Sequence, residues 1–271
     1  MELVRVLVTS TIGDERLQQI TAISPEIKVT DASHLFRLER RGDSISKEKL
    51  DVTLAEAEVI FGLGLPQNIV KRAPRLKWVQ VMSAGVDRFL DTEMVESSIM
   101  MTNASGIHAV PISEVVLELM LMFVKQAPLY FHLKRERQWR RLAPLELRSK
   151  TVGIVGLGSI GREVARLAKA FGMRVLATRR STRRIGRARH VDIMLPSNHL
   201  HRLLLESDFV VLTIALTSET NKLIGEEELR TMKSNAYLIN VARGDVVDEE
   251  VLIRALDEHC DCRCRSRRLC Y

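Results

Sequence analysis

The first part of the chain alternates short apolar runs with stretches in which apolar and polar residues mix. The apolar runs predict buried strands at residues 4–8, 27–30, 59–62, 77–82 and 99–103. Between the first two runs, residues 14–23 have the pattern of an amphipathic helix that begins after Gly13. Strands that alternate with helices form a parallel sheet that is covered on both faces. We therefore predict a small α/β domain here.

A second alternation of the same kind begins at Lys150. It predicts strands at residues 151–155, 174–178, 209–214 and 237–241, and helices at 159–171 and 249–257. Gly172 follows the first of these helices, as a C-terminal glycine cap does. A helix at residues 111–124 precedes this part and is apolar on most faces. We expect that helix to be buried or to pack against a partner subunit.

A glycine-rich turn joins the strand at 151–155 to the helix that follows it. Gly156 allows the tight turn, Gly158 lets a pyrophosphate approach the backbone, and Gly161 lets the helix pack closely on the strand. Ser159 and Ile160 open the helix, where free N–H groups and a partial positive charge favour phosphates. The strand–turn–helix context predicts dinucleotide binding. The alternative is a glycine turn that binds no ligand.

The end of the next strand bears on the choice of cofactor. Sites for NAD carry an acidic residue about 20 residues after the glycines, for the ribose 2′-hydroxyl. Here the strand ends in Arg179, Arg180 and Ser181, without an Asp or Glu. Guanidinium groups bind a 2′-phosphate with charge-assisted hydrogen bonds. We therefore predict NADPH as the preferred cofactor, with NAD possible; the alternative is a solvated basic loop that confers no preference.

Several further segments resemble, in the same order, motifs of the D-isomer-specific 2-hydroxyacid dehydrogenases. The resemblance extends over nearly the whole chain, to about residue 259. The segments that carry it are residues 81–87, 102–106, 139, 147–153, 212–220, 232–233 and 240–248. The resemblance implies two doubly wound parallel-sheet domains: a flavodoxin-like substrate domain at 1–102 and a Rossmann NAD(P)-binding domain at 103–259. It also implies reduction of a small 2-keto acid to a D-2-hydroxy acid, as in glyoxylate/hydroxypyruvate reductases or phosphoglycerate dehydrogenase-like enzymes.

The resemblance assigns roles to individual residues. Arg243 ends a predicted strand, and its guanidinium can grip the carboxylate and carbonyl of a keto acid and polarise the carbonyl. A structural ion pair is the alternative for this arginine. The small-residue turn of Ser83, Ala84 and Gly85 offers backbone N–H groups to the substrate carboxylate. The remaining residues assigned to the cofactor are Leu216, Thr217, Val241 and Ala242.

Composition narrows the remaining possibilities. The chain has 271 residues, 46% of them hydrophobic, enough for two ordinary domains. We expect a cytoplasmic protein that does not interact with membranes, because no apolar run is long enough to span a bilayer and no signal-peptide layout opens the chain. The net charge of +7 is concentrated in arginines at 179–189 and 263–268, but no aromatic residues interleave with them. We therefore predict no nucleic-acid partner and, from the helix at 111–124, a homodimer.

The last twelve residues do not fit the family pattern and hold all four cysteines. Their Cys-x-Cys-x-Cys spacing is wrong for structural zinc pairs, so we predict no metal site. Read one base later, codons for residues 260–271 can spell Ala-Ile-Ala-Gly-Ala-Gly-Leu-Asp-Val-Phe, a motif of the family at this position. We therefore expect a frameshifted tail and a C-terminally truncated second domain.

A truncated second domain would have two consequences. The sheet would lose its last strands and expose an edge. The glutamate and histidine that the family uses for proton transfer would be missing, and none of the histidines present is a convincing substitute; they are His34, His108, His132, His190, His199, His201 and His259. We expect weak NADPH binding and doubtful activity. The alternative function is a non-catalytic protein that binds or senses NADPH.

Overall fold

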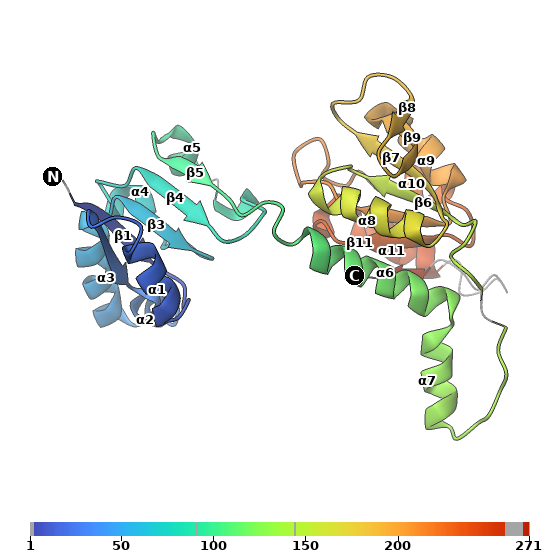
Figure 1. The fold of residues 1–271 in the computed structure, drawn as a ribbon, viewed down its shortest axis with the longest axis horizontal. Helices are drawn as coiled ribbons and strands as arrows, with labels where there is room; N and C mark the ends of the chain where they lie inside the picture. The colour runs from blue at the N-terminus through green and yellow to red at the C-terminus, as the bar shows by residue number, and fades with distance from the viewer. Residues whose placement is uncertain (1–2, 90–91, 144, 258–267, 271) are drawn as a thin grey trace. The chain divides into compact units, whose positions relative to one another are not determined.

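The computed structural model describes residues 3–89, 92–143, 145–257 and 268–270. The chain divides into two compact units, Met1–Ile107 and His108–Tyr271 (Figure 1). Each unit has its own sheet and its own apolar core. Within the described residues, no helix has the length and apolar character needed to cross a membrane.

The first unit is a five-stranded parallel sheet in the order β2-β1-β3-β4-β5, which is the flavodoxin-like order. Its strands are β1 (Val4–Val8), β2 (Ile27–Asp31), β3 (Val59–Gly62), β4 (Trp78–Val81) and β5 (Met100–Thr102). Its helices are α1 (Asp14–Thr21), α2 (Ser33–Glu39), α3 (Ser44–Glu56), α4 (Ile69–Arg72), the 3-10 turn η1 (Asp87–Phe89) and α5 (Thr92–Glu96).

Helix α3 covers one face of the first sheet. It begins after Asp43, whose carboxylate accepts hydrogen bonds from the backbone N–H of Ile45 (3.2 Å) and the hydroxyl of Ser46 (2.6 Å). Leu50 and Leu54 on this helix are fully buried against the sheet. The sequence did not predict α3, because its apolar residues do not line one clear stripe.

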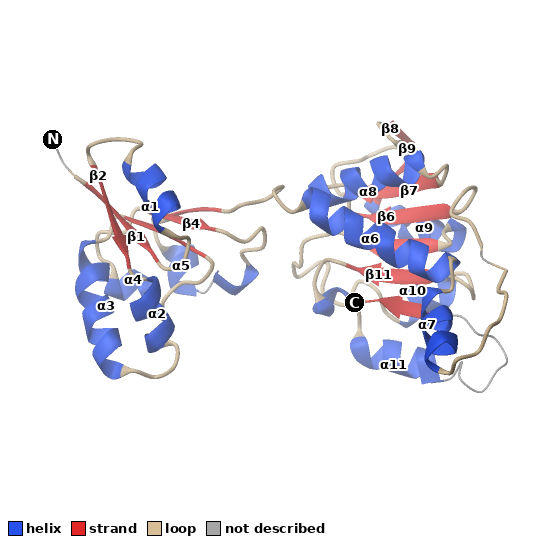
Figure 2. Cartoon of the chain, turned by 60° about the horizontal axis from the view of Figure 1, so that its bottom comes forward, coloured by secondary structure: helices blue, strands red, loops and turns tan. Residues whose placement is uncertain are grey.

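The second unit is a seven-stranded sheet in the order β12-β11-β10-β6-β7-β9-β8 (Figure 2). Apart from β8, its strands are parallel and follow the doubly wound 3-2-1-4-5-6 order of dinucleotide-binding domains. They are β6 (Thr151–Val155), β7 (Arg174–Arg179), β8 (Gly186–Ala188), β9 (Val191–Pro196), β10 (Phe209–Leu212), β11 (Tyr237–Asn240) and β12 (Arg268–Cys270). The predicted pair of doubly wound α/β domains is therefore confirmed.

Helices cover both faces of this second sheet. One face packs on α6 (Ala109–Val124) and α8 (Ser159–Ala170), and the other on α9 (Leu200–Glu206), α10 (Glu226–Thr231) and α11 (Glu249–Asp257). The other helices are α7 (Ala127–Arg135) and the 3-10 turns η2 (Ser197–His199) and η3 (Gly244–Val246). One side of α6 is buried in the core, while Val110 (52% exposed) and Val115 (47% exposed) lie on its other side.

Two details of this sheet go beyond the sequence prediction. The strand β8 runs antiparallel to β9 at one edge, so the sheet is mixed. At the opposite edge, β12 pairs in parallel with β11, with Arg268 beside Tyr237. Strand pairing uses backbone groups, so a segment without the family's side chains still adds to the sheet. The rest of the predicted frameshifted tail, 260–267 and 271, lies outside the described residues.

Candidate functional site

The three glycines of the turn after β6 have different surroundings. Gly156 has a φ of +99°, and a Cβ there would lie 2.3 Å from Cγ2 of Ile214. A Cβ on Gly161 would lie 2.5 Å from the carbonyl oxygen of Gly156. On Gly158, a Cβ would meet no heavy atom of the described residues within 4 Å. The fold therefore requires glycine at 156 and 161, whereas glycine at 158 keeps space open above the turn.

The turn lies where the strand order of the sheet reverses. The Oγ1 of Thr213 donates a hydrogen bond to the Gly156 carbonyl at 2.6 Å. The N–H groups of Gly156 and Leu157 donate to the Thr178 carbonyl at 3.2 and 2.9 Å. Strands β10 and β7 thus hold the turn from both sides of β6. Sequence reasoning missed the role of Thr213, whose only signal is its place directly after β10.

Helix α8 begins at the glycine turn with Ser159, and Gly158 is its N-cap. The first N–H groups of a helix have no partner inside the helix, and they carry the positive end of its dipole. Glycine has no side chain that could cap them. The backbone N–H groups of Ser159, Ile160 and Gly161 therefore face the open space above Gly158 as potential phosphate donors. A pyrophosphate group fits this arrangement.

Basic side chains gather at the end of β7, the strand beside β6. Arg179 ends this strand, and Arg180 and Ser181 follow it; all three are exposed. Within the described part of the chain, neither arginine forms an ion pair or a side-chain hydrogen bond. Their guanidinium charges are therefore not neutralised by nearby carboxylates. This is the position at which a dinucleotide-binding domain meets the ribose 2′-substituent.

The segment after β11 carries Arg243. The Asn240 side chain accepts the Ala242 N–H at 3.0 Å and donates to the Arg243 carbonyl at 2.8 Å. This amide fixes the backbone that presents Val241, Ala242 and the exposed Arg243 beyond the carboxyl end of the strand.

Asp248 ends the segment that follows Arg243. Hydrogen bonds from the Lys222 ammonium and the Val251 N–H hold the pKa of the Asp248 carboxyl below its usual value. The Lys222 ammonium lies 3.1 Å from this carboxylate. Asp248 therefore stays ionised and joins the loop before α10 to the start of α11.

The loop after β10 is held together by a threonine. The Oγ1 of Thr220 accepts the Thr217 N–H at 2.8 Å and donates to the Ala215 carbonyl at 2.7 Å. Leu216 is half-buried beneath this loop and Thr217 is exposed. Because β6, β10 and β11 are neighbours, the glycine turn, this loop and Arg243 all follow the carboxyl ends of adjacent strands. The structure thus brings the predicted cofactor residues to the side of the second sheet where the carboxyl ends of its parallel strands lie.

The predicted carboxylate turn lies in the first unit, after β4. Ala104 N–H donates to the Ser83 carbonyl at 3.1 Å, and the Asn103 amide donates to the Ala84 carbonyl at 2.9 Å. The Ser83 hydroxyl donates to the Gly85 carbonyl at 2.8 Å. Among the described residues, no acceptor contacts the backbone N–H groups of Ser83, Ala84 and Gly85. The carbonyls are thus engaged, while the three N–H groups are available to an anion.

One histidine contacts carboxylates in the second unit. The Nε2 of His201 lies 3.0 Å from Oε1 of Glu228, and its Nδ1 lies 3.6 Å from Glu227. The other oxygen of Glu228 accepts the Gly225 N–H at 3.1 Å, so this side chain also caps α10. We therefore assign the group to joining α9 and α10. The expectation of no metal site stays a prediction.

The strand order, the glycine turn and the exposed start of α8 define a dinucleotide-binding α/β protein. The sequence model of the D-isomer specific 2-hydroxyacid dehydrogenase NAD binding domain matches residues 117–261. The chain belongs to the D-isomer specific 2-hydroxyacid dehydrogenase family, as its motifs predict.

Curated relatives extend the similarity into the first unit. The chain is 28% identical over 262 residues to D-3-phosphoglycerate dehydrogenase from Methanocaldococcus jannaschii, covering 94% of this chain and 47% of the relative. It is 32% identical over 255 residues to glyoxylate reductase from Pyrococcus horikoshii, covering 88% of this chain and 75% of the relative. The chain thus spans about half to three quarters of the length of these relatives.

Solved structures share the fold of both units. A D-isomer specific 2-hydroxyacid dehydrogenase family protein from Aeromonas salmonicida is 27% identical with a TM-score of 0.81, over 94% of this chain and 78% of that one. An NADPH-dependent glyoxylate/hydroxypyruvate reductase from Sinorhizobium meliloti, solved in complex with NADP and sulfate, is 25% identical with a TM-score of 0.75. The match covers 94% of this chain and 78% of that one. A D-lactate dehydrogenase from Aquifex aeolicus, complexed with NAD and lactic acid, is 26% identical with a TM-score of 0.72. The match covers 94% of this chain and 73% of that one.

Proposed function

We propose that this chain binds NADPH and acts on a small 2-keto acid, which is reduced to the D-2-hydroxy acid. The observation that carries the proposal is the combination of open space above Gly158 with the guanidinium groups of Arg179 and Arg180, which have no partner among the described residues. The first accommodates the pyrophosphate, and the second binds the 2′-phosphate that distinguishes NADPH from NADH. The Sinorhizobium meliloti relative, which was solved with NADP, supports this choice, whereas the Aquifex aeolicus relative was solved with NAD.

The residues of this chain have separate tasks in the proposed reaction. The reduced nicotinamide, when bound, would supply the hydride, and water would supply the proton that completes the new hydroxyl group. Arg243 polarises the keto-acid carbonyl, because a guanidinium stabilises the negative charge that develops on its oxygen. The N–H groups of Ser83, Ala84 and Gly85 bind a carboxylate. We propose that Leu216 and Thr217, which follow β10 beside β6, contact the cofactor together with Val241 and Ala242, which follow β11 on the far side of β10.

The cofactor preference is tested by titration of the full chain with each reduced cofactor. We expect NADPH to bind at least tenfold more tightly than NADH, because each charge-assisted hydrogen bond contributes about 1.5–3 kcal/mol. A double substitution of Arg179 and Arg180 by Gln should remove that preference and leave NADH affinity within about twofold. The control is Arg254→Gln on α11, which is also exposed and outside the site. Tighter binding of NADH by the unmodified chain would contradict the proposal.

We also propose that two copies of the chain associate through α6, α7 and the segment after α7. Large apolar side chains recur there with high exposure: Val110 (52%), Val115 (47%), Phe131 (62%) and Trp139 (98%). Exposed apolar side chains that recur along one region are typical of protein–protein contacts.

We also propose that the protein is cytoplasmic, because residues 1–259 contain no cysteine, which suits a reducing compartment.

A further inference from the structure

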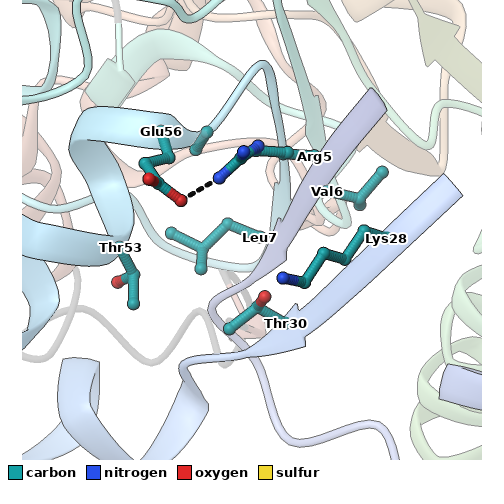
Figure 3. Close-up of a pocket in the computed structure, with 8 residues that line it drawn as sticks. Arg5, Val6, Leu7, Lys28, Thr30, Thr53 and Glu56 are labelled. Carbon is teal, nitrogen blue, oxygen red and sulfur yellow. Dashed lines mark hydrogen bonds and ion pairs between the residues drawn. The ribbon is translucent and has the colours of Figure 1, made fainter. Parts of the chain in front are cut away.

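The first unit contains a pocket that none of the proposed roles uses. It lies at the end of the sheet where β1 and β2 begin, beside the last turn of α3 (Figure 3). Its cavity volume is about 50 Å³, and it opens to solvent beside the exposed residues Lys28 and Thr30. Its lining residues are Arg5, Val6, Leu7, Lys28, Thr30, Thr53, Glu56 and Ala57.

The register of the two strands explains this lining. Arg5 pairs with Lys28, and Leu7 pairs with Thr30. Because side chains alternate along a strand, these four side chains all rise on the face that α3 covers. Leu7 and Ala57 are each only 2% exposed and form an apolar floor. The polar groups stand around that floor, as Figure 3 shows.

The pocket carries one positive charge that forms no ion pair with a carboxylate of the described residues. Arg5 and Lys28 lie side by side on neighbouring strands, an arrangement of like charges that is unfavourable on its own. Arg5 forms an ion pair with Glu56 from α3. Among the described residues, Lys28 has no ion-pair partner. Its ammonium group points into the pocket, so the lining carries two cations and one anion.

Hydroxyl groups complete the lining. The Thr53 hydroxyl donates to the Leu50 carbonyl at 2.8 Å, so its proton is already used. In the described part of the chain, the Thr30 hydroxyl has no hydrogen-bond partner, and it lies on the same strand face as Lys28. A bound group with one negative charge could accept hydrogen bonds from both Lys28 and Thr30.

We propose that this pocket binds a small organic monocarboxylate, with its carboxylate on Lys28 and Thr30 and its carbon chain over Leu7 and Ala57. A net charge of one matches a monoanion, and the apolar floor favours a carbon chain over a purely inorganic anion. The site is distinct from the turn of Ser83–Gly85, because that turn follows the carboxyl end of β4. Strands β1 and β3 also lie between β2 and β4, so at about 4.8 Å per strand the two sites are roughly 14 Å apart across the sheet.

The test is a titration of the full chain with sodium propionate, followed by amide signals in two-dimensional ¹⁵N NMR spectra at constant ionic strength. We expect saturable shifts at Arg5, Thr30 and Ala57. In Lys28→Met, which keeps the apolar stem but removes the charge, the dissociation constant should rise at least about tenfold. The control Lys47→Met lies on the exposed side of α3 and should behave as the unmodified chain.

Three results would overturn the proposal. The first is the absence of saturable shifts at these amides. The second is equal affinity in Lys28→Met and the unmodified chain, with the spectrum of the variant showing an intact fold. The third is binding of inorganic phosphate at this pocket as tight as that of propionate, which would show a general attraction of anions to Lys28. Shifts at Ser83–Gly85 report on the separate carboxylate turn, so the two sites are judged independently.

Discussion

The second and third glycines of the turn, Gly158 and Gly161, should respond to the same substitution in opposite ways. In Gly158→Ala the new methyl meets no heavy atom of the described chain within 4 Å, and the backbone at φ −86° and ψ −155° is extended, which alanine tolerates. The free energy of unfolding should stay the same or rise by about 0.4–1 kcal/mol, because alanine restricts the unfolded chain. The methyl fills the space into which we place the pyrophosphate, so NADPH affinity should fall at least tenfold.

Gly161→Ala should instead destabilise the fold. Its methyl would lie 2.5 Å from the Gly156 carbonyl oxygen and 3.0 Å from both Cγ2 of Ile154 and Oγ1 of Thr213. The carbonyl is backbone, and Ile154 is fully buried, so neither can easily move. Overpacking of this kind costs about 1–3 kcal/mol, which exceeds the gain of about 1 kcal/mol from replacing a helical glycine. Subtracting this gain leaves an expected net loss of up to about 2 kcal/mol.

Both quantities are measurable on the same samples. Urea unfolding gives the free energy of unfolding, and the fluorescence of NADPH gives its affinity. If Gly158→Ala bound NADPH as tightly as the unmodified chain, the space above Gly158 would not be where the cofactor lies. If Gly161→Ala were as stable as the unmodified chain, α8 would not pack on the glycine turn as the structure shows.

Three further substitutions test other contacts. Thr213→Val removes the hydrogen bond to Gly156 and should cost about 1 kcal/mol in urea unfolding and weaken NADPH binding, while Thr213→Ser should restore both. Burial opposes ionisation of Asp192, yet the Val175 N–H and the Lys169 ammonium hold its pKa below the usual value. The stability that this carboxylate contributes is therefore fully present above about pH 4 and is lost as the pH falls through its lowered pKa. Asp192→Asn should accordingly lose more stability at about pH 7 than at about pH 3. Trp139→Gln should raise the dimer dissociation constant in sedimentation experiments, without changing unfolding of the monomer, because Trp139 is 98% exposed.

Strong local patterns allowed most of the sheet to be predicted. The runs at β1, β3, β6 and β7 are apolar and β-branched, and each lies within a residue of its predicted bounds. Strand β9 was missed because Asp192 interrupts its apolar residues and a run of arginines precedes it. The ammonium of Lys169 on α8 lies 2.9 Å from that carboxylate, a contact that no local pattern predicts.

The candidate site was predictable in composition but not in its internal contacts. Three glycines at the end of a strand predicted the turn, since their spacing is local. Part of what makes Gly156 and Gly161 necessary comes from the residues after β10: Ile214 faces Gly156, and the Thr213 hydroxyl binds the Gly156 carbonyl, which lies against Gly161. These residues become neighbours only because the chain crosses from β9 past β7 and β6 to β10, which reverses the strand order. The position that depends least on the fold, Gly158, is therefore the one whose glycine is best explained by a ligand.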